Sequence, residues 1–255
     1  MKKFALVGNP VLCSKSPELF SAAYKDYDFE YSLIETTDIK HIESLLKEKI
    51  LSGINVTAPI KVEALSIVDE IDDIAEKIGA TNTIVMQPDN KLKAYNTDYL
   101  GVMQTFNHFN IDVKNKECLI VGAGGASFAA AFAMHSLGAK VTIANRTADK
   151  AKKIAEKINC STINISQFDE SISNKEIIIN TLPPNICIFD TEKLNDSQIF
   201  FDASYQQTSL LQTAQTKGCK CIDGRYWLLF QGIAAYKIFT GIEPNTDAMR
   251  KILDI

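Results

Sequence analysis

The chain has 255 residues, enough for one large domain or two of medium size. Its 46% hydrophobic and 23% charged residues are typical of a folded globular protein. A formal net charge of −4, and no apolar run long enough to span a bilayer, give no reason to expect nucleic acid or a membrane as a partner.

The cysteines and histidines bear on whether the protein binds a metal and on which residue type acts as an acid or base. The six cysteines lack the spacing of a zinc site, so we predict free thiols in a reducing cytoplasm and no bound metal. The three histidines, His41, His108 and His135, are expected to be surface or core side chains, so an acid or base in this protein is expected to be another residue type.

Strand-like and helix-like segments alternate along the chain, which indicates an α/β protein. Ser16 and Pro17 mark one helix start, with Ser16 as the predicted N-cap. The first half is predicted to contain a strand over 3–8, a helix from 16, a strand over 31–36, a helix near 38–51, a strand within 53–61 and an amphipathic helix near 61–78.

The stretch "GINVTAPIK" at 53–61 combines a strand pattern with polar side chains. Because successive residues of a strand face opposite sides, Ile54 and Val56 share one face while Asn55 and Thr57 share the other. Lys61 follows where the chain leaves the strand. Buried polar groups are costly unless they are paired, so these side chains either pair internally or face a polar ligand.

The next segment is predicted to be a β-hairpin with its turn at "QPDN", residues 87–90. Strand pairing then places Asn82 opposite position 97, within one residue, so that Asn82 and Asp98 meet at the open end of the hairpin. That location, where the chain crosses to its second half, suits a site between domains. In isolation, Asp98 could equally be the N-cap of the following helix.

A second α/β segment starts at 116 with a strand, a Gly-rich turn, a helix and a strand. In "GAGGAS", Gly122 and Gly124 occupy positions of a dinucleotide-binding turn, and Ser127 stands where a third glycine is usual. Such a turn lets the backbone approach a pyrophosphate at a helix N-terminus. The predicted cofactor-binding turn comprises Gly122, Ala123, Gly124, Gly125 and Ala126.

The end of the second strand of this segment bears on the choice of dinucleotide. NAD-binding domains usually place an acidic residue there, but this chain has Asn145, Arg146 and Thr147, with Lys150 one turn later. Cations without a carboxylate favour a 2′-phosphate, and hence NADP. The alternatives are a solvated helix start, or a methyltransferase, which the missing acidic residue disfavours.

Two serine hydroxyls near the N-terminus are suitable donors for binding an anion. Ser14 and Ser16 lie at a helix start whose free N–H groups would hold a carboxylate, although Ser16 alone could simply cap the helix.

Taken together, the motifs resemble the shikimate dehydrogenase family along nearly the full chain. The motifs "GNPVLCSKSP", "GINVTAPIK", "GATNT", "NTDYLG", "VGAGGAS", "NRT" and "FQGIAAYKIFTG" fall in the family's order. The resemblance implies an α/β fold of two domains. Residues 1–98 and 224–255 would form the substrate-binding domain, to which the C-terminal helices return, and residues 99–223 a Rossmann-type, doubly wound NADP-binding domain.

The resemblance also implies roles for particular residues. Lys61 and Asp98 match the catalytic pair, and Ser14 and Ser16 match the hydroxyls that hold the substrate carboxylate. Lys61 could act as a base if burial favours its neutral form, or it could polarise the oxygen as a cation. The positions that match binders of the ring hydroxyls are Asn55, Thr57, Asn82 and Gln231, and Tyr205 is expected to line the same pocket.

The chain departs from the family pattern in several places. Cys13 stands where histidine is usual, and Trp227 where methionine is usual. Tyr205 is followed by "QQTSLL" without proline, and "NTLPPN" at 180–185 looks shortened and lacks Gly-Met. The segment 180–185 is expected near the nicotinamide, so these departures bear most on the affinity for the cofactor and on the reaction rate.

The resemblance implies NADPH-dependent reduction of 3-dehydroshikimate to shikimate in aromatic amino-acid synthesis, by a cytoplasmic monomer or homodimer. One alternative is a quinate-active paralogue with altered cofactor preference. Methylene-tetrahydrofolate dehydrogenases share a lysine and a two-domain layout but would not need the serine pair. A non-catalytic NADP-binding sensor would be expected to lose Lys61 or Asp98, and both are present.

Overall fold

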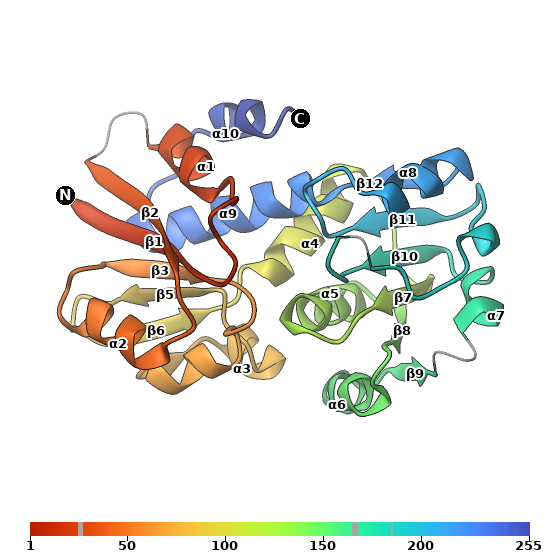
Figure 1. Ribbon diagram of the computed structural model, residues 1–255, viewed down its shortest axis with the longest axis horizontal. Coiled ribbons are helices and arrows are strands. Elements are labelled where there is room, and N and C mark those ends of the chain that lie inside the picture. Colours follow the sequence, from red (N-terminus) through yellow and green to blue (C-terminus); the bar gives the residue numbers. More distant parts are fainter. Residues whose placement is uncertain (25–27, 165–167, 185) are drawn as a thin grey trace. The chain divides into compact units, whose positions relative to one another are not determined.

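The computed structural model describes residues 1–24, 28–164, 168–184 and 186–255. It confirms the α/β class and divides into two compact units, Met1–Leu100 with Leu229–Ile255, and Gly101–Leu228 (Figure 1). The domain limits expected from the sequence, at 98/99 and 223/224, stay predictions. No helix in the described ranges is long and apolar enough to cross a bilayer.

The first unit is built on a mixed sheet with strand order β2-β1-β3-β5-β6-β4. Strand β1 pairs in parallel with β2 and β3, whereas β5 runs antiparallel to both β3 and β6. The strands are β1 Lys2–Gly8, β2 Phe29–Glu35, β3 Gly53–Val56, β4 Glu70–Ile71, β5 Thr83–Met86 and β6 Leu92–Tyr95. The helices are α1 Ser16–Ala23, α2 Ile39–Lys47, η1 Glu63–Ile67, α3 Asp73–Ile78 and α10 Thr246–Ile252, with the end of α9 Gly224–Thr240 and the start of α4 Asp98–His108.

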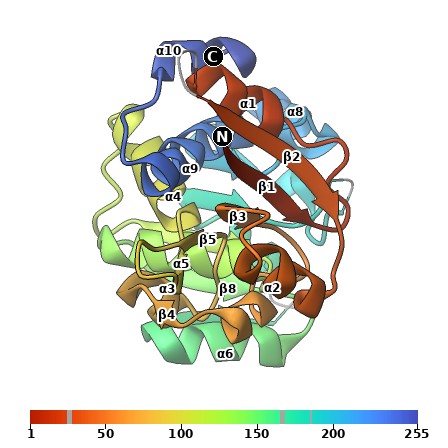
Figure 2. The same ribbon diagram turned by 90° about the vertical axis from the view of Figure 1, so that its left-hand side faces the viewer.

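Side-chain alternation gives this sheet two distinct faces. Ile54 and Val56 join an apolar cluster that includes Ile42 and Leu46 of α2. On the other face, Phe4 stacks on Phe239 of α9 with ring centroids 4.5 Å apart. That face, covered by α1 and α9 (Figure 2), is the one to which Asn55 belongs, so a polar side chain lies among aromatic rings.

Three expected elements differ in the structure. The helix predicted near 61–78 is interrupted, because Val68 is extended and β4 pairs with β6, and a new helix begins at the side-chain cap of Asp72. The helix predicted near 38–51 ends at Lys47. The N-cap of α1 is Lys15 and not Ser16, since the Ser16 hydroxyl bonds elsewhere.

The second unit is a wholly parallel sheet with strand order β12-β11-β10-β7-β8-β9. Chain order runs outward from β7 in both directions, so the topological switch point lies between β7 and β10, where doubly wound folds bind ligands beyond the carboxyl ends of the strands. The elements are β7 Glu117–Val121, α5 Gly125–Ser136, β8 Lys140–Ala144, α6 Ala148–Ile158, β9 Ser161–Ile163, α7 Phe168–Ile172, β10 Ile177–Asn180, η3 Thr191–Lys193, β11 Ile199–Asp202, α8 Ser209–Thr216 and β12 Lys220–Ile222.

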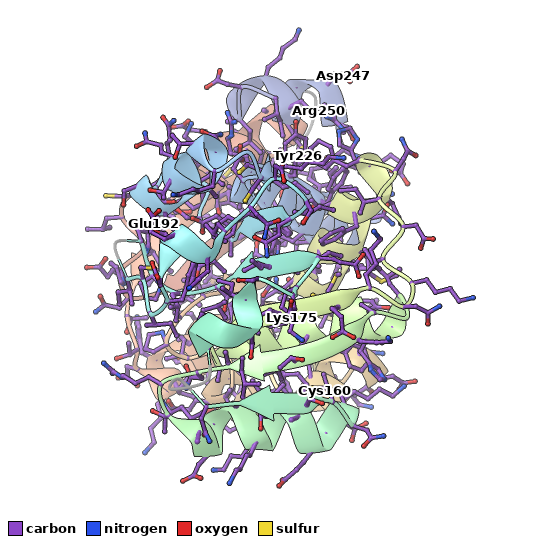
Figure 3. All side chains as sticks on the ribbon, turned by 90° about the vertical axis from the view of Figure 1, so that its right-hand side faces the viewer. Cys160, Lys175, Glu192, Tyr226, Asp247 and Arg250 are labelled. Atoms are coloured by element: carbon purple, nitrogen blue, oxygen red, sulfur yellow. The ribbon has the colours of Figure 1, made fainter. Side chains whose placement is uncertain are left out.

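A partly buried ion pair lies at the amino end of β7, opposite the carboxyl ends of the strands. Lys175, labelled in Figure 3, places Nζ 3.1 Å from Glu117 Oε2 and 3.2 Å from Thr142 Oγ1. The hydrogen bond from Lys175 lowers the pKa of Glu117. These groups therefore satisfy each other through direct hydrogen bonds.

Candidate functional site

The serine pair begins a chain of hydrogen bonds in the first unit. Ser14 Oγ donates to Ser16 Oγ at 3.0 Å, and the Ser16 N–H donates to Ser14 Oγ at 3.2 Å. The Ser16 hydroxyl lies near the phenol of Tyr31, where it lowers the phenol's pKa. Ser14 and Ser16 are therefore held together at the start of α1.

Tyr31 connects the serines to Asn55 across the sheet. Its hydroxyl donates to Asn55 Oδ1 at 2.7 Å, and its ring stacks on Phe20 with centroids 4.3 Å apart. Burial, assisted by the neighbouring Tyr24, raises the pKa of Tyr31 well above its ordinary value, against the opposing hydrogen bond from Ser16. The phenol is consequently neutral and remains a donor.

The amide of Asn55 is fixed by its surroundings. Its Nδ2 lies 3.1 Å from the main-chain oxygen of Asn82 and 3.0 Å from Thr83 Oγ1. A carbonyl oxygen can only accept, so Nδ2 must face Asn82 and Oδ1 must face Tyr31. Of the two possibilities that the sequence left open, internal pairing is observed, because the protein itself satisfies both ends of the Asn55 amide.

Asn82, Thr97 and Gln231 form a second group of polar side chains. Asn82 Nδ2 donates to Thr97 Oγ1 at 2.9 Å and to Gln231 Oε1 at 3.4 Å, while Asn82 Oδ1 accepts from the Thr97 N–H at 2.7 Å. The β5–β6 hairpin places Thr83 opposite Tyr95, so Asn82 meets position 96, within the expected margin of one residue. Gln231 comes from α9, far along the chain.

The lysine and the carboxylate that were predicted to act together form an ion pair. Lys61 Nζ donates to Asp98 Oδ2 at 2.5 Å, with side chains only 16% and 10% exposed. The Thr81 N–H holds the Lys61 main chain through its oxygen, and Asp98 directly follows Thr97. The ammonium therefore lies in a largely desolvated position next to the polar group of Asn82.

Thr57 lies just beyond β3, where the backbone approaches β1 closely. Gly8 has φ +156, and a Cβ there would overlap Thr57 Cγ2 and come 2.8 Å from the Ala58 oxygen. Glycine at position 8 is thus required by the close approach that sets the position of Thr57.

In the second unit, the Gly-rich turn follows β7 and opens α5. Gly122 has φ +120, and a Cβ there would lie 2.5 Å from Thr181 Oγ1, whereas a Cβ at Gly124 would meet nothing within 4 Å. The contacts of Ser127 account for a serine at the third glycine position of the motif. Its Oγ accepts from the Gly124 N–H at 3.0 Å and lies 2.6 Å from Thr181 Oγ1. The turn is tied to the end of β10 and open on its outer side.

The residues after β8 present free positive charge. Arg146 and Lys150 are exposed and form no ion pair with any residue in the described ranges. Asn145 Nδ2 donates to the Thr147 oxygen at 3.0 Å, which shapes the turn into α6. An anion could approach both cations.

Tyr205 lies in the loop after β11. Together with residues 181–184 and 203–206, it lines a cavity of about 350 Å³ at the carboxyl ends of β10 and β11. Of the predicted site residues, it is the one substrate-binding position in the second unit. The "NTLPPN" segment borders the same cavity, although its last residue, Asn185, lies outside the described residues.

Sequence reasoning missed three contributors to these sites. Tyr31 and Thr97 are single polar residues in strand-like segments, and Thr181 follows an apolar strand. Their partners lie between 15 and 54 residues away, so local pattern carries no signal for them. A polar residue at the end of an otherwise apolar strand is the one hint that was available.

The two units, one with a doubly wound sheet and a Gly-rich turn at its switch point, define a two-domain α/β protein of the dinucleotide-binding class. Family models match three stretches of the chain: the shikimate dehydrogenase substrate binding domain at 6–84, shikimate / quinate 5-dehydrogenase at 104–206, and the shikimate 5′-dehydrogenase C-terminal domain at 228–253.

Known proteins agree with these matches. A shikimate dehydrogenase (NADP(+)) from Methanococcoides burtonii is 36% identical over 98% of this chain and 97% of its own. A shikimate dehydrogenase crystallised with NADP+ is 35% identical with a TM-score of 0.91, covering 100% of this chain and 95% of that one. A quinate dehydrogenase from Corynebacterium glutamicum in complex with NAD is 25% identical with a TM-score of 0.91, covering 100% and 99%. The chain belongs to the shikimate dehydrogenase family.

Tyr31→Phe tests the hydrogen bond between the two polar groups of the first unit. The variant keeps the stacking on Phe20 but leaves Asn55 Oδ1 without its donor, so the free energy of unfolding should fall by about 1–3 kcal/mol in urea denaturation. Tyr95→Phe is the matched control, since the Tyr95 hydroxyl bonds no described residue. Equal stability of the two variants would contradict the role of Tyr31.

Proposed function

We propose that this protein catalyses the reversible NADPH-dependent reduction of 3-dehydroshikimate to shikimate, in the synthesis of chorismate and aromatic amino acids. The observation that carries the proposal is the desolvated Lys61–Asp98 pair beside the polar group of Asn82, Thr97 and Gln231. The family membership and the relatives named for this reaction support it.

The second unit fits an NADP molecule. The open Gly-rich turn at 122–126 would hold the pyrophosphate at the N-terminus of α5. The cations Arg146 and Lys150, with Asn145 and Thr147, would hold the 2′-phosphate, since no carboxylate stands at the end of β8 to bind a free ribose. When bound, NADPH supplies the hydride for the carbonyl carbon.

The chain's own residues handle the proton. In the reduction, the Lys61 ammonium donates a proton to the substrate oxygen as that oxygen gains charge, and the resulting amine regains a proton from solvent. Asp98 holds the ammonium in place through the 2.5 Å hydrogen bond and binds the reacting hydroxyl. In the reverse direction, the neutral amine of Lys61 accepts the proton.

The remaining polar residues orient the substrate. The Ser14 and Ser16 hydroxyls turn from each other to the carboxylate, which prefers donors. Asn55, Thr57, Asn82 and Gln231 bind ring hydroxyls. Because Asn55 and Asn82 are already held by protein partners, they present their remaining hydrogen-bonding capacity in fixed directions.

We place the reaction in the cytoplasm, consistent with six free thiols, and expect the active form to be a monomer or a homodimer.

A four-way assay tests the function directly. The purified protein is offered shikimate or quinate, each with NADP or NAD, and nicotinamide reduction is followed by absorbance. Rapid reduction with shikimate and NADP alone is expected. Faster reduction with quinate or with NAD would instead indicate a quinate-active paralogue. No reduction in any of the four combinations, with NADP binding retained, would indicate a non-catalytic sensor.

Lys61→Ala tests the proton transfer. Turnover should fall by about 10²–10⁴-fold, the usual contribution of a positioned acid or base, with little change in far-ultraviolet circular dichroism. Lys91→Ala serves as the control, because the ion pairs of Lys91 with described residues, Glu70 and Asp89, are exposed. Near-normal turnover of the Lys61 variant would remove its catalytic assignment.

Arg146→Ala tests the dinucleotide preference. The Michaelis constant for NADP should rise about tenfold or more, as expected for a lost charge-assisted hydrogen bond, whereas that for NAD should change little. Lys152→Ala, on the helix α6 that follows Arg146, controls for the loss of one surface charge. An equal change for both dinucleotides would refute binding of the 2′-phosphate by Arg146.

A further inference from the structure

A buried carboxylate lies at the carboxyl end of the second unit's sheet, outside the residues assigned above. Asp202 ends β11, is 1% exposed and pairs in register with Asn180, the last residue of β10. A carboxylate with so little exposure requires several donors to remain in place.

The donors to Asp202 come from both neighbouring loops. Oδ1 accepts from Asn180 Nδ2 at 3.4 Å and from the Ser204 N–H at 3.1 Å. Oδ2 accepts from the Thr208 hydroxyl at 2.6 Å, and Thr208 in turn caps α8 by accepting from the Leu211 N–H at 3.0 Å. One side chain thus fixes where the loop after β11 begins and where it ends.

Asn180 extends the same arrangement to the loop after β10. Its Oδ1 accepts from the Leu182 N–H at 3.4 Å, and its main-chain oxygen accepts from the Ala203 N–H at 2.8 Å. The two loops, 181–184 and 203–206, are the ones that line the 350 Å³ cavity. Their main chains are therefore held by the Asn180–Asp202 pair.

The position of this cavity identifies what it would hold. It begins at Thr181, which also touches the Gly-rich turn through Ser127. Arg146 and Lys150 lie after β8, on the other side of β7 in the strand order. A dinucleotide whose pyrophosphate rests on the central turn has its two nucleosides on opposite sides, so the half remote from the 2′-phosphate falls at β10 and β11.

We propose that Asp202, acting through Asn180 and Thr208, is a positioning residue that sets the two loops around the nicotinamide half of NADP. This inference rests on the proposed function. Asp202 need not touch the cofactor; it holds the loop that carries Tyr205 and the loop that follows β10 in one arrangement.

Burial raises the pKa of Asp202, and the hydrogen bonds from Thr208, Ser204 and Asn180 oppose that shift. The same donors that position the loops therefore stabilise the charged form of this carboxylate.

Binding of two different ligands distinguishes a positioning role of Asp202 from a role in folding. Adenosine 2′,5′-bisphosphate reports only on the Arg146 side, whereas NADPH binding and turnover also require the β10 and β11 loops. In Asp202→Ala, turnover should fall by about 100-fold, as expected when reacting groups are misplaced by about 1 Å, while affinity for adenosine 2′,5′-bisphosphate is unchanged. Asp202→Asn, which keeps one acceptor, should lie between Asp202→Ala and the wild type.

The controls use the same unit. Asp112→Asn removes an exposed carboxylate that accepts only from the Lys114 N–H, and should leave turnover and both affinities unchanged. Thr208→Val removes one donor to Asp202 and should lower turnover, whereas Thr208→Ser should restore it. If Asp202→Ala does not fold, the two Thr208 variants test the positioning role of Asp202 in its place.

Wild-type turnover in Asp202→Ala or in Thr208→Val would overturn the inference. So would an equal loss of affinity for NADPH and adenosine 2′,5′-bisphosphate in a folded Asp202 variant, because that pattern belongs to a general structural role. Failure of the wild-type protein to bind either ligand would instead overturn the proposed function.

Discussion

The structure of the first unit depends on the satisfaction of one buried amide. Asn55 lies on a sheet face otherwise covered by aromatic rings, where an unpaired polar group would cost several kcal/mol. Tyr31 supplies a donor on one side, and the Asn82 oxygen supplies an acceptor on the other. These two bonds connect Tyr31, which lies near Ser16, to the polar group at the β5–β6 hairpin.

Under the proposed function, this arrangement separates the groups that orient the substrate from the group that reacts with it. The amides of Asn55 and Asn82 are held by other protein atoms, so their directions are fixed without a ligand. Among the described residues, Lys61 has one ion-pair partner, Asp98, and under the proposed function its ammonium is the group that exchanges a proton. In the second unit, the Ser127–Thr181 and Asn180–Asp202 contacts similarly fix the loops at the carboxyl ends of the strands.

Much of this could be predicted from the sequence, because the relevant signals are local. Strand alternation placed Ile54 and Val56 opposite Asn55, and the "QPDN" turn predicted the hairpin register to within one residue. The interrupted helix at 61–78 could not be predicted, since the β4–β6 pairing that breaks it is a contact between distant segments. Ser16 was assigned as a cap because its tertiary neighbour, Tyr31, was not visible in a helix-start pattern.

The sequence by itself determined the α/β class, the family, the Gly-rich turn and the cations that follow β8, because each depends on residue type at short spacing. Only the tertiary structure decided that Asn55 is satisfied by Tyr31, that Ser127 binds Thr181 and that Asp202 joins two loops. The physical reason is that a buried polar side chain takes whichever partner the fold brings within about 3 Å, and that partner can lie anywhere along the chain.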